Sequence, residues 1–281
     1  MKFDLHTHST ASDGTLSPRN VWQCAVDQQL NLFALTDHDT LDGYLELSAL
    51  SDVMYHDMSL ISGIEVSSAY FSNSIHIVGL NVDVCHPSLL SLVTKLQQLR
   101  QQRAERMVSK LEKGLLLNGL YDRVLAHAGC KPWLLTRPHI ARYLVEAGVV
   151  SNEAQAFKRW LAQGKKAYVH TDWPDYSDVV RVISESGGVS VLAHPLKYGK
   201  MTRTKIKAML QAFARAGGHA VEVVYQQQSA DDTRYLTRLC QQFGLHASGG
   251  SDYHGPHMPW SAVGKVPELP SECQPVWRLF N

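Results

Sequence analysis

The chain has 281 residues, of which 44% are hydrophobic and 19% charged, as in ordinary globular proteins. The formal net charge of +1 favours neither nucleic-acid nor membrane binding, and no apolar run is long enough to span a bilayer. Five scattered cysteines without a CxxC pair argue against a disulfide framework and a cysteine zinc site. The N-terminal residues lack the apolar stretch of a signal peptide, so we expect a cytoplasmic protein.

The first predicted element is a strand over residues 3–8, followed by a turn at Asp13. Residues two apart on a strand face the same side, so the imidazoles of His6 and His8 would project from the same face of the strand. Two imidazoles and a nearby carboxylate make half of a divalent-metal site. The alternative is two surface histidines beside a turn.

The next residues predict alternating helices and strands. Ser17 and Pro18 suit the start of a helix. Residues 31–35 predict a buried strand that ends near His38, and Asp39 or Thr40 would cap a second helix. Two further strands are expected, residues 60–64 ending at Glu65 and residues 75–80 containing His76.

Three more strands are expected near the C-terminus, at residues 189–193, 219–224 and 245–250. The first leads to His194, and the last leads to Asp252 and His254. About seven strand–helix units with polar strand ends predict an α/β fold, a (β/α) barrel with its site at the carboxyl ends of the strands. A doubly wound open sheet is the alternative, but it would more naturally carry a glycine-rich phosphate loop, which is absent.

Residues 87–164 interrupt this alternation as a helical insertion, so the barrel is expected at residues 1–86 and 165–281. A long helix over residues 87–113 and two shorter ones over 137–147 and 152–163 are predicted. From Lys95 to Lys166 there are fourteen Lys and Arg against five Asp and Glu, a balance of +9, which leaves −8 elsewhere. The insertion is either a basic lid that gathers an anionic substrate or an ordinary basic helical surface.

Six imidazoles and three carboxylates stand at or near strand ends: His6, His8, Asp13, His38, Glu65, His76, His194, Asp252 and His254. Nine ligands exceed the need of one ion and suit two or three, with Glu65 as a bridging carboxylate. Nitrogen and oxygen ligands without sulfur favour Mn²⁺, Zn²⁺ or Fe²⁺. Clustered ions of this kind hydrolyse phosphate esters by activating water and holding the phosphate oxygens.

These motifs together resemble the PHP (polymerase and histidinol phosphatase) family, and within it the TrpH/YciV-like branch. The resemblance is carried by His6-Thr7-His8, Ser12-Asp13-Gly14, Thr36-Asp37-His38-Asp39, Gly63-Ile64-Glu65, Ala193-His194-Pro195 and Ser251-Asp252-Tyr253-His254. The branch features are residues 76–81, Thr136-Arg137-Pro138-His139 and residues 226–229.

The resemblance implies a distorted (β/α)7 barrel with two or three divalent ions. We expect Mn²⁺ first, with Zn²⁺ or Fe²⁺ as alternatives. It implies three ligand groups: His6, His8, Glu65 and Asp252; then Glu65, His76 and His194; then Asp13, His38 and His254. Asp13, His38, His194 and His254 would also serve catalysis. The implied substrates are nucleoside 3′,5′-bisphosphates, which lose the 3′-phosphate, and short 5′-phosphorylated RNA, which is shortened from the 5′ end.

Both substrates carry a 5′-phosphate, and four residues are candidates to recognise the substrate: Arg137, His139, Lys197 and Tyr198. Arginine offers phosphate a planar fork, and Pro138 suits the first turn of a helix whose N–H groups could join it. The sequence departs from the branch at Leu196-Lys197-Tyr198, where the branch has Gly-Arg-Tyr. Lysine supplies the charge without the fork.

Two other functions stay open at this point. One is a phosphatase for another small monoester, such as histidinol phosphate, which needs no pocket for a second phosphate. The other is a non-catalytic nucleic-acid-binding module, although such a module would be expected to lack ligands that this chain has. The remaining histidines, His56, His86, His127, His170, His219, His246 and His257, are interpreted as structural or surface residues.

Overall fold

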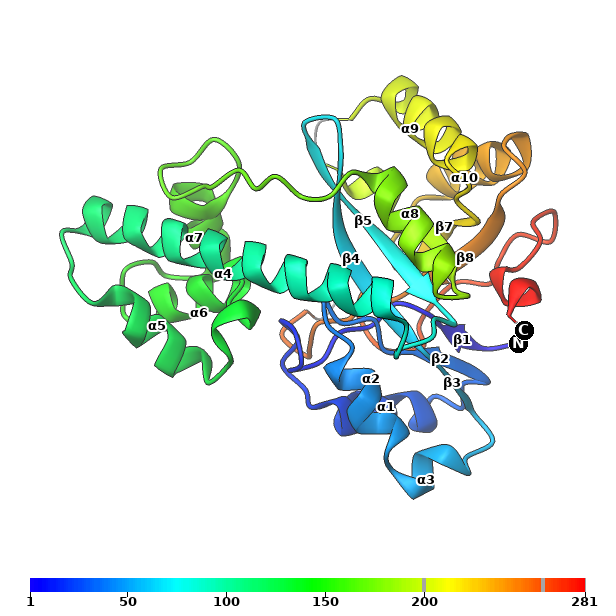
Figure 1. Ribbon diagram of the computed structural model, residues 1–281, viewed down its shortest axis with the longest axis horizontal. Coiled ribbons are helices and arrows are strands. Elements are labelled where there is room, and N and C mark those ends of the chain that lie inside the picture. The colour runs from blue at the N-terminus through cyan, green and yellow to red at the C-terminus, as the bar shows by residue number, and fades with distance from the viewer. Residues whose placement is uncertain (199–200, 259–260, 281) are drawn as a thin grey trace. The chain divides into compact units, whose positions relative to one another are not determined.

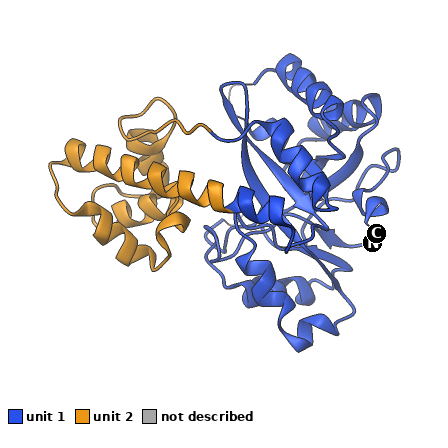
Figure 2. Ribbon diagram, viewed as in Figure 1, with its two compact units in different colours: residues 1–93, 173–281 blue, residues 94–172 orange. Residues whose placement is uncertain are grey.

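The computed structural model describes residues 1–198, 201–258 and 261–280, and the chain divides into two compact units (Figure 2). Unit 1 comprises residues 1–93 and 173–281, and unit 2 comprises residues 94–172. Helix α4 (Pro87–Leu115) begins in unit 1 and continues into unit 2. The chain therefore leaves unit 1 after one of its strands, forms unit 2, and returns to unit 1 before the next strand.

Unit 1 is built on two sheets (Figure 1). The first is parallel and contains β1 (Phe3–Asp4), β2 (Leu32–Ala34) and β3 (Ser59–Ile61). The second has the order β4 (Gly63–Tyr70), β5 (Asn73–Leu80), β6 (Val189–Leu192), β7 (Ala220–Tyr225) and β8 (His246–Gly250). In it β5 runs antiparallel to β4 and β6, whereas β6, β7 and β8 are parallel.

The helices of unit 1 bury one apolar face each. Helix α1 shows why the local sequence folds this way: Ser17 caps it by accepting the N–H of Asn20, and Pro18 occupies its first turn. Helix α8 packs on β4, β5 and β6, and α10 packs on β7 and β8 (Figure 1). The helices are α1 (Pro18–Asp27), α2 (Asp42–Ser48), α3 (Ser51–Met54), α8 (Tyr176–Glu185), α9 (Arg203–Arg215) and α10 (Ala230–Gln242), with short 3₁₀ turns η3 (Pro195–Lys197) and η4 (Val276–Leu279).

The two sheets approach each other at two seams. At one, the N–H of Leu5 donates to the carbonyl of Gly249 over 3.4 Å, and Thr7 pairs with Tyr253. At the other, His38 pairs with Glu65. Gly250 is required at the first seam, because a side-chain carbon there would overlap the Cβ and backbone of His6. These seams draw the ends of distant strands into one neighbourhood.

Unit 2 is helical and has its own apolar core, which includes Met107, Leu120, Ile140, Leu144 and Leu161. Its elements are most of α4, then α5 (Leu120–Ala128), η1 (Pro132–Leu134), α6 (Arg137–Glu146), α7 (Glu153–Ala156) and the π-helical turn η2 (Phe157–Leu161). No helix in the described part of the chain combines the length and the apolar character needed to cross a membrane.

The α/β class is confirmed, but several expected elements differ. The strand expected over residues 60–64 is two strands, and Glu65 lies inside β4 rather than at a strand end. The strand with His76 forms an antiparallel hairpin with β4, not a parallel unit. The first strand ends at Asp4, so His6 and His8 lie in the following loop. The short loop of two residues between β4 and β5 leaves no room for a crossover helix.

Two helix predictions also need correction. Helix α2 begins at Asp42, and Thr40 accepts the N–H of Asp42 in a turn instead of capping the helix; Asp39 accepts the N–H of Ser67. In the insertion, α5 was not expected, and residues 152–163 form a short α-helix followed by a π-helical turn.

Candidate metal centre

The nine histidines and carboxylates singled out in the sequence converge in unit 1. They come from the loops after β1, β2, β6 and β8 and from the hairpin of β4 and β5. Ligand atoms within 4.8 Å of one another form four groups: His8, Asp13, His38 and His254; His6, Glu65 and His194; His6, His8 and Asp252; and His38, Glu65 and His76. The groups share members, so they describe one continuous cluster.

Glu65 stands at the centre of this cluster and is fully buried. Its Oε1 lies 2.8 Å from Nδ1 of His76, 3.1 Å from Nε2 of His194 and 3.3 Å from Nε2 of His6. Its Oε2 lies 2.8 Å from Nδ1 of His38 and 3.3 Å from Nε2 of His8. One carboxylate thus touches five imidazoles.

The opposite side of the cluster is closed by two aspartates. Asp13 Oδ1 lies 3.3 Å from Nε2 of His254, and Asp252 Oδ1 lies 3.3 Å from Nε2 of His8. The rings of His8 and His254 stack with centroids 4.0 Å apart. Two imidazoles held this close repel each other when both are protonated, so at least one ring of the pair is favoured neutral.

The electrostatics keep the carboxylates ionised. Burial alone would raise the pKa of Glu65, but His38, His76 and His6 outweigh it and hold the pKa well below its ordinary value. Burial and the charge of His254 lower the pKa of His8 to about 3. Burial also acts to lower the pKa of His254, but Asp13 outweighs it and the pKa rises to about 9.

The residues fit a divalent cation. The Nε2 atoms of His6 and His8 are buried and lie 3.3 Å from Glu65 oxygens, yet they lack the alignment of a hydrogen bond with any residue that the structure describes. Buried polar atoms without such partners are costly unless another group satisfies them. Lone pairs that converge without bonding one another are what a shared cation needs, and the nitrogen and oxygen donors suit Mn²⁺, Zn²⁺ or Fe²⁺.

Glu222 is part of the site although the sequence reading did not single it out. The Nδ1 of His6 donates to its Oε1 over 2.7 Å, and the N–H of His194 donates to its Oε2 over 2.6 Å. The first bond fixes the proton of His6 on Nδ1 and leaves Nε2 to face the cluster. A lone carboxylate within the apolar strand β7 was the signal that could have found it.

Three residues near the site adopt left-handed backbone conformations. They are Asp39, with φ 54°, His194, with φ 29°, and Asp252, with φ 52°. Such conformations are unfavourable for residues other than glycine and persist only where the surroundings impose them. The bond from His194 N–H to Glu222 and the bond from Asp252 N–H to the carbonyl of His6 are two such restraints.

Other acidic residues near the cluster hold its loops together. Asp37 accepts the N–H and the hydroxyl of Ser9, both over 2.7 Å, and the hydroxyl of Ser12 over 2.6 Å. Asp4 accepts the N–H of Ser251 over 2.9 Å, and burial raises the pKa of Asp4 to about 6. Asp37 therefore ties the loop after β1 to the loop after β2, and Asp4 ties β1 to the loop after β8.

Two of the predicted substrate residues lie in unit 1. The Nζ of Lys197 is 2.9 Å from Oδ2 of Asp252 and 4.7 Å from the ring centroid of Tyr225. The hydroxyl of Tyr198 donates to the carbonyl of Ala193 and accepts the N–H of His76. Lys197 therefore brings a positive charge to the cluster, whereas the Tyr198 hydroxyl joins β5 to the chain after β6.

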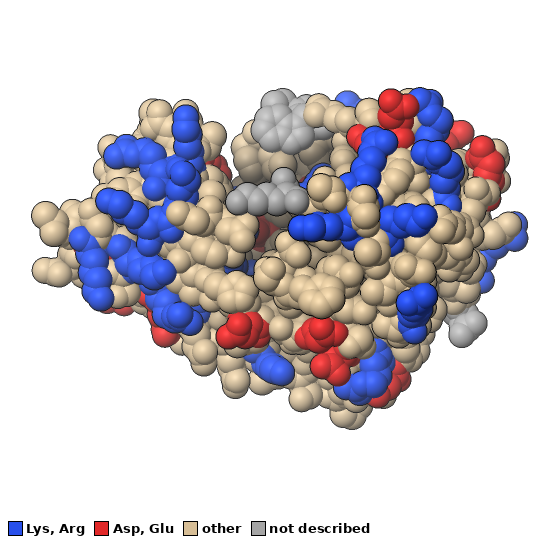
Figure 3. Space-filling model, turned by 90° about the horizontal axis from the view of Figure 1, so that it is seen from above, with Lys and Arg blue, Asp and Glu red and all other residues tan. Residues whose placement is uncertain are grey.

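The other two, Arg137 and His139, lie at the start of α6 in unit 2. His139 accepts the N–H of Thr136 on its Nδ1 over 3.1 Å, so its proton resides on Nε2 in that arrangement. The Arg137 guanidinium carbon lies 5.8 Å from the ring centroid of Phe157. Unit 2 contains fourteen Lys and Arg against six Asp and Glu, and blue side chains cover much of its face on the left of Figure 3.

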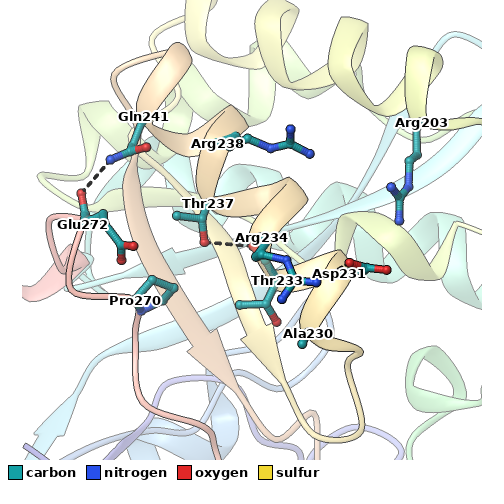
Figure 4. Close-up of a pocket in the computed structure, with 10 residues that line it drawn as sticks. All are labelled: Arg203, Ala230, Asp231, Thr233, Arg234, Thr237, Arg238, Gln241, Pro270 and Glu272. Atoms are coloured by element: carbon teal, nitrogen blue, oxygen red, sulfur yellow. Dashed lines mark hydrogen bonds and ion pairs between the residues drawn. The ribbon is translucent and has the colours of Figure 1, made fainter.

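A separate hollow of about 720 Å³ lies in unit 1 along α10, and none of the nine cluster residues lines it (Figure 4). Two of its arginines are paired: Arg203 lies 2.9 Å from Asp232, and Arg234 contacts Asp231. Gln241 donates to the carbonyl of Glu272. Three arginines and two carboxylates line the hollow, and two of the arginines are already paired with carboxylates.

Comparisons with known proteins identify what the chain is similar to. The profile of the family described as PHP domain matches residues 4–244. A 5′-3′ exoribonuclease of Haemophilus influenzae is 40% identical over 279 residues, 99% of each chain. A 3′,5′-nucleoside bisphosphate phosphatase of Chromobacterium violaceum is 36% identical over 275 residues, 98% of this chain and 95% of that one. A solved Chromobacterium violaceum structure, described as an amidohydrolase with bound sulfate and no metal, is 35% identical with a TM-score of 0.90, covering 100% of this chain and 96% of that one.

Proposed function

This chain belongs to the PHP domain family, and from that premise we propose that it is a metal-dependent phosphoesterase acting on 5′-phosphorylated nucleotides. It would remove the 3′-phosphate of nucleoside 3′,5′-bisphosphates and shorten 5′-phosphorylated RNA from the 5′ end. The observation that carries the proposal is the cluster of nine imidazoles and carboxylates around Glu65. The substrate class is supported by the names of relatives that match nearly the whole chain.

The cluster would hold two or three divalent ions, Mn²⁺ foremost, through His6, His8, Asp13, His38, Glu65, His76, His194, Asp252 and His254. When bound, the ions would supply Lewis-acid polarisation of the phosphate oxygens and lower the pKa of the attacking water. Asp13, His38, His194 and His254 would also act on the reacting groups.

The chain's own residues hold this arrangement in place. Glu222 orients the His6 ring and the His194 backbone, so the two histidines keep a fixed separation. Lys197 balances the charge of Asp252 and would attract a phosphate that approaches the cluster. The buried position of Glu65 excludes bulk water from the centre.

Recognition of the 5′-phosphate is assigned to the insertion, residues 87–164, with the catalytic part at residues 1–86 and 165–281. Arg137 and His139 lie in the first turn of α6, where N–H groups and the helix dipole favour an anion. The positive charge of unit 2 supports a role in gathering anionic substrates. Tyr198 would contribute through its ring, since its hydroxyl is bonded to the backbone.

Two further features belong to the proposal. The seams between the sheets, at Leu5 and Gly249 and at His38 and Glu65, support closure as a distorted (β/α)7 barrel. A cytoplasmic location also stays a prediction, which fractionation of cells that produce the protein would check.

The test compares adenosine 3′,5′-bisphosphate with adenosine 3′-monophosphate, with Mn²⁺ present or removed. We expect Mn²⁺-dependent release of phosphate, with kcat/KM higher for the bisphosphate. Equal kcat/KM on both would point to a general monoesterase and contradict the 5′-phosphate requirement. Metal-loaded protein without activity on either substrate would contradict the phosphoesterase assignment.

A further inference from the structure

An exposed aromatic residue occupies the tip of the β4–β5 hairpin in unit 1. Tyr70 pairs with Asn73, so Phe71 and Ser72 form a two-residue turn. Phe71 has φ 52°, and 83% of it is exposed. A turn with positive φ at its first central residue favours glycine there, and a bulky residue is unfavourable in that conformation. Neither the turn nor the core explains why a phenylalanine stands at this position.

The Phe71 ring contacts a chain of aromatic rings that leads back into unit 1. Its centroid lies 4.8 Å from that of Tyr70 at an interplanar angle of 74°, and Tyr70 packs in the same manner on Tyr176. The strand beneath is fixed as well, because the N–H of Ala69 donates to the carbonyl of Pro174 over 2.8 Å. The Phe71 ring thus has an aromatic neighbour on one side, and its high exposure leaves the ring accessible to another flat group.

The hairpin tip lies beyond the metal centre on the side of the strand carboxyl ends. Because β5 is antiparallel to both β4 and β6, β4 runs in the same direction as β6. His76 pairs with Ser67, and Phe71 follows Ser67 by four residues. At about 3.3 Å per residue, Phe71 therefore lies roughly 13 Å farther along the strand direction than His76 of the cluster. The outer part of β5, before Ile77, extends past its pairing with β6 (Figure 1).

We propose that Phe71 is a stacking platform for a nucleobase of the RNA substrate on the 3′ side of the bond that is cut. This inference rests on the proposed function and extends it to a subsite. In a nucleoside 3′,5′-bisphosphate the only base lies on the 5′ side of the cut bond, so Phe71 has no base to stack. In RNA, bases follow on the 3′ side, and aromatic stacking accepts any of them.

The experiment measures kcat/KM on adenosine 3′,5′-bisphosphate and on a 5′-phosphorylated pentaribonucleotide, with Mn²⁺, for the wild type and four variants. Phe71→Ala and Phe71→Gly remove the ring, and glycine suits the turn. Phe71→Trp restores a stacking surface. Tyr55→Ala is the matched control, since Tyr55 is 84% exposed at the end of α3.

We expect Phe71→Ala and Phe71→Gly to lower kcat/KM on the RNA about five- to a hundredfold, mainly through KM, with the bisphosphate unchanged. Phe71→Trp and Tyr55→Ala should keep both activities, and Phe71→Gly should unfold at or above the wild-type temperature. RNA cleavage by the Ala and Gly variants at the wild-type rate, or equal losses on both substrates, would overturn the platform.

Binding of the same pentaribonucleotide, labelled at its 3′ end and followed by fluorescence anisotropy, separates this inference from the proposed function. Weaker RNA binding by the Ala and Gly variants alone supports the platform even if turnover is absent. Wild-type protein that cleaves the bisphosphate but neither binds nor cleaves RNA contradicts the platform while leaving the phosphatase activity intact. Inactivity on both substrates with normal RNA binding contradicts the phosphoesterase assignment instead.

Discussion

At the scale of single residues, the function depends on side chains that are oriented before any ligand arrives. Glu222 is the clearest example, because it accepts one bond from the ring of His6 and one from the backbone of His194. Which nitrogen of His6 faces the cluster is defined by this hydrogen bond to Glu222 rather than by His6 itself.

Replacing Glu222 should therefore weaken metal binding more than it weakens the fold. We expect Glu222→Ala to lower Mn²⁺ affinity about 10- to 100-fold, and Glu222→Gln to fall in between, since an amide keeps one of the two acceptor atoms. Isothermal titration calorimetry measures both, and Glu185→Ala, on the exposed side of α8, is the control. Unchanged affinity in the alanine variant would show that Glu222 serves only the fold.

Asp13 and His254 contact each other in the cluster, and their loss should affect turnover most. We expect Asp13→Ala or His254→Ala to reduce kcat by at least about a hundredfold, more than the loss of a residue that only orients a ligand. Steady-state assays at saturating Mn²⁺ check this. A variant that regains full rate at high Mn²⁺ has lost affinity alone, and its proposed catalytic role would be incorrect.

Arg137 is predicted to contribute binding rather than chemistry. Arg137→Ala should raise KM for 5′-phosphorylated substrates by roughly tenfold or more, the value of a charged hydrogen bond, with little change in kcat. Arg106→Ala, an exposed arginine of the same unit, is the control for loss of charge. Equal losses on substrates without a 5′-phosphate would refute the assignment.

The sequence predicted the residues that form the cluster better than the residues that orient them. His6, His8, His38 and Asp252 stand in recognisable motifs near strand ends, whereas Glu222 appears as one acid in an apolar strand. Its role depends on the approach of β7 to the loop after β1, 216 residues away in sequence. Local patterns contain no information about such a contact.

At the scale of elements, periodicity found most strands and helices but not how strands pair. Nothing local distinguishes β5 in an antiparallel hairpin from a parallel strand, because both are apolar runs. The two-residue turn at Phe71 and Ser72 was hidden because it lacks the Asn-Gly or Gly-rich signal of such turns. Helix α5 was missed because it is short and starts at a left-handed glycine, Gly119, rather than a capping side chain.

The junction of β6 and β7 should make the fold sensitive to mild acid. His219 accepts the N–H of Ser190 on Nδ1 over 3.1 Å, and burial, with the neighbouring charge of His246, lowers the pKa of His219. Because the pKa of His219 is lower in the folded protein, the unfolded chain takes up the proton first. The free energy of unfolding therefore decreases as pH falls below the ordinary histidine value near 6.5. We expect His219→Gln to flatten the decline in unfolding temperature between about pH 6.5 and 5. Parallel declines in both proteins would contradict this.

At the scale of the whole molecule, the two units should respond differently to metal. The cluster belongs to unit 1 and draws on loops from both of its sheets, so cations that bind only the folded state should stabilise that unit. At a hundredfold excess of Mn²⁺ over Kd the gain is about 2.7 kcal/mol.

Chelation should reverse this gain in unit 1 alone. We expect hydrogen exchange after chelator treatment to quicken in the loops after β1 and β8, with α5 and α6 in the separate core of unit 2 unchanged. An Asp13→Ala variant should show a smaller difference in exchange rate between the metal-loaded and the chelated protein. Equal quickening in both units would argue against a metal centre confined to unit 1.

The seam at Gly250 and the loops beside it have a consequence for how the protein is made. His6 and His254 stand 248 positions apart (254 − 6), and both are needed beside His8. During synthesis the amino-terminal histidines emerge from the ribosome long before Asp252, so an early cation would meet an incomplete set of ligands. If the cluster binds metal as proposed, complete loading would wait until the chain has been made past His254, and chains released before that point would retain metal poorly.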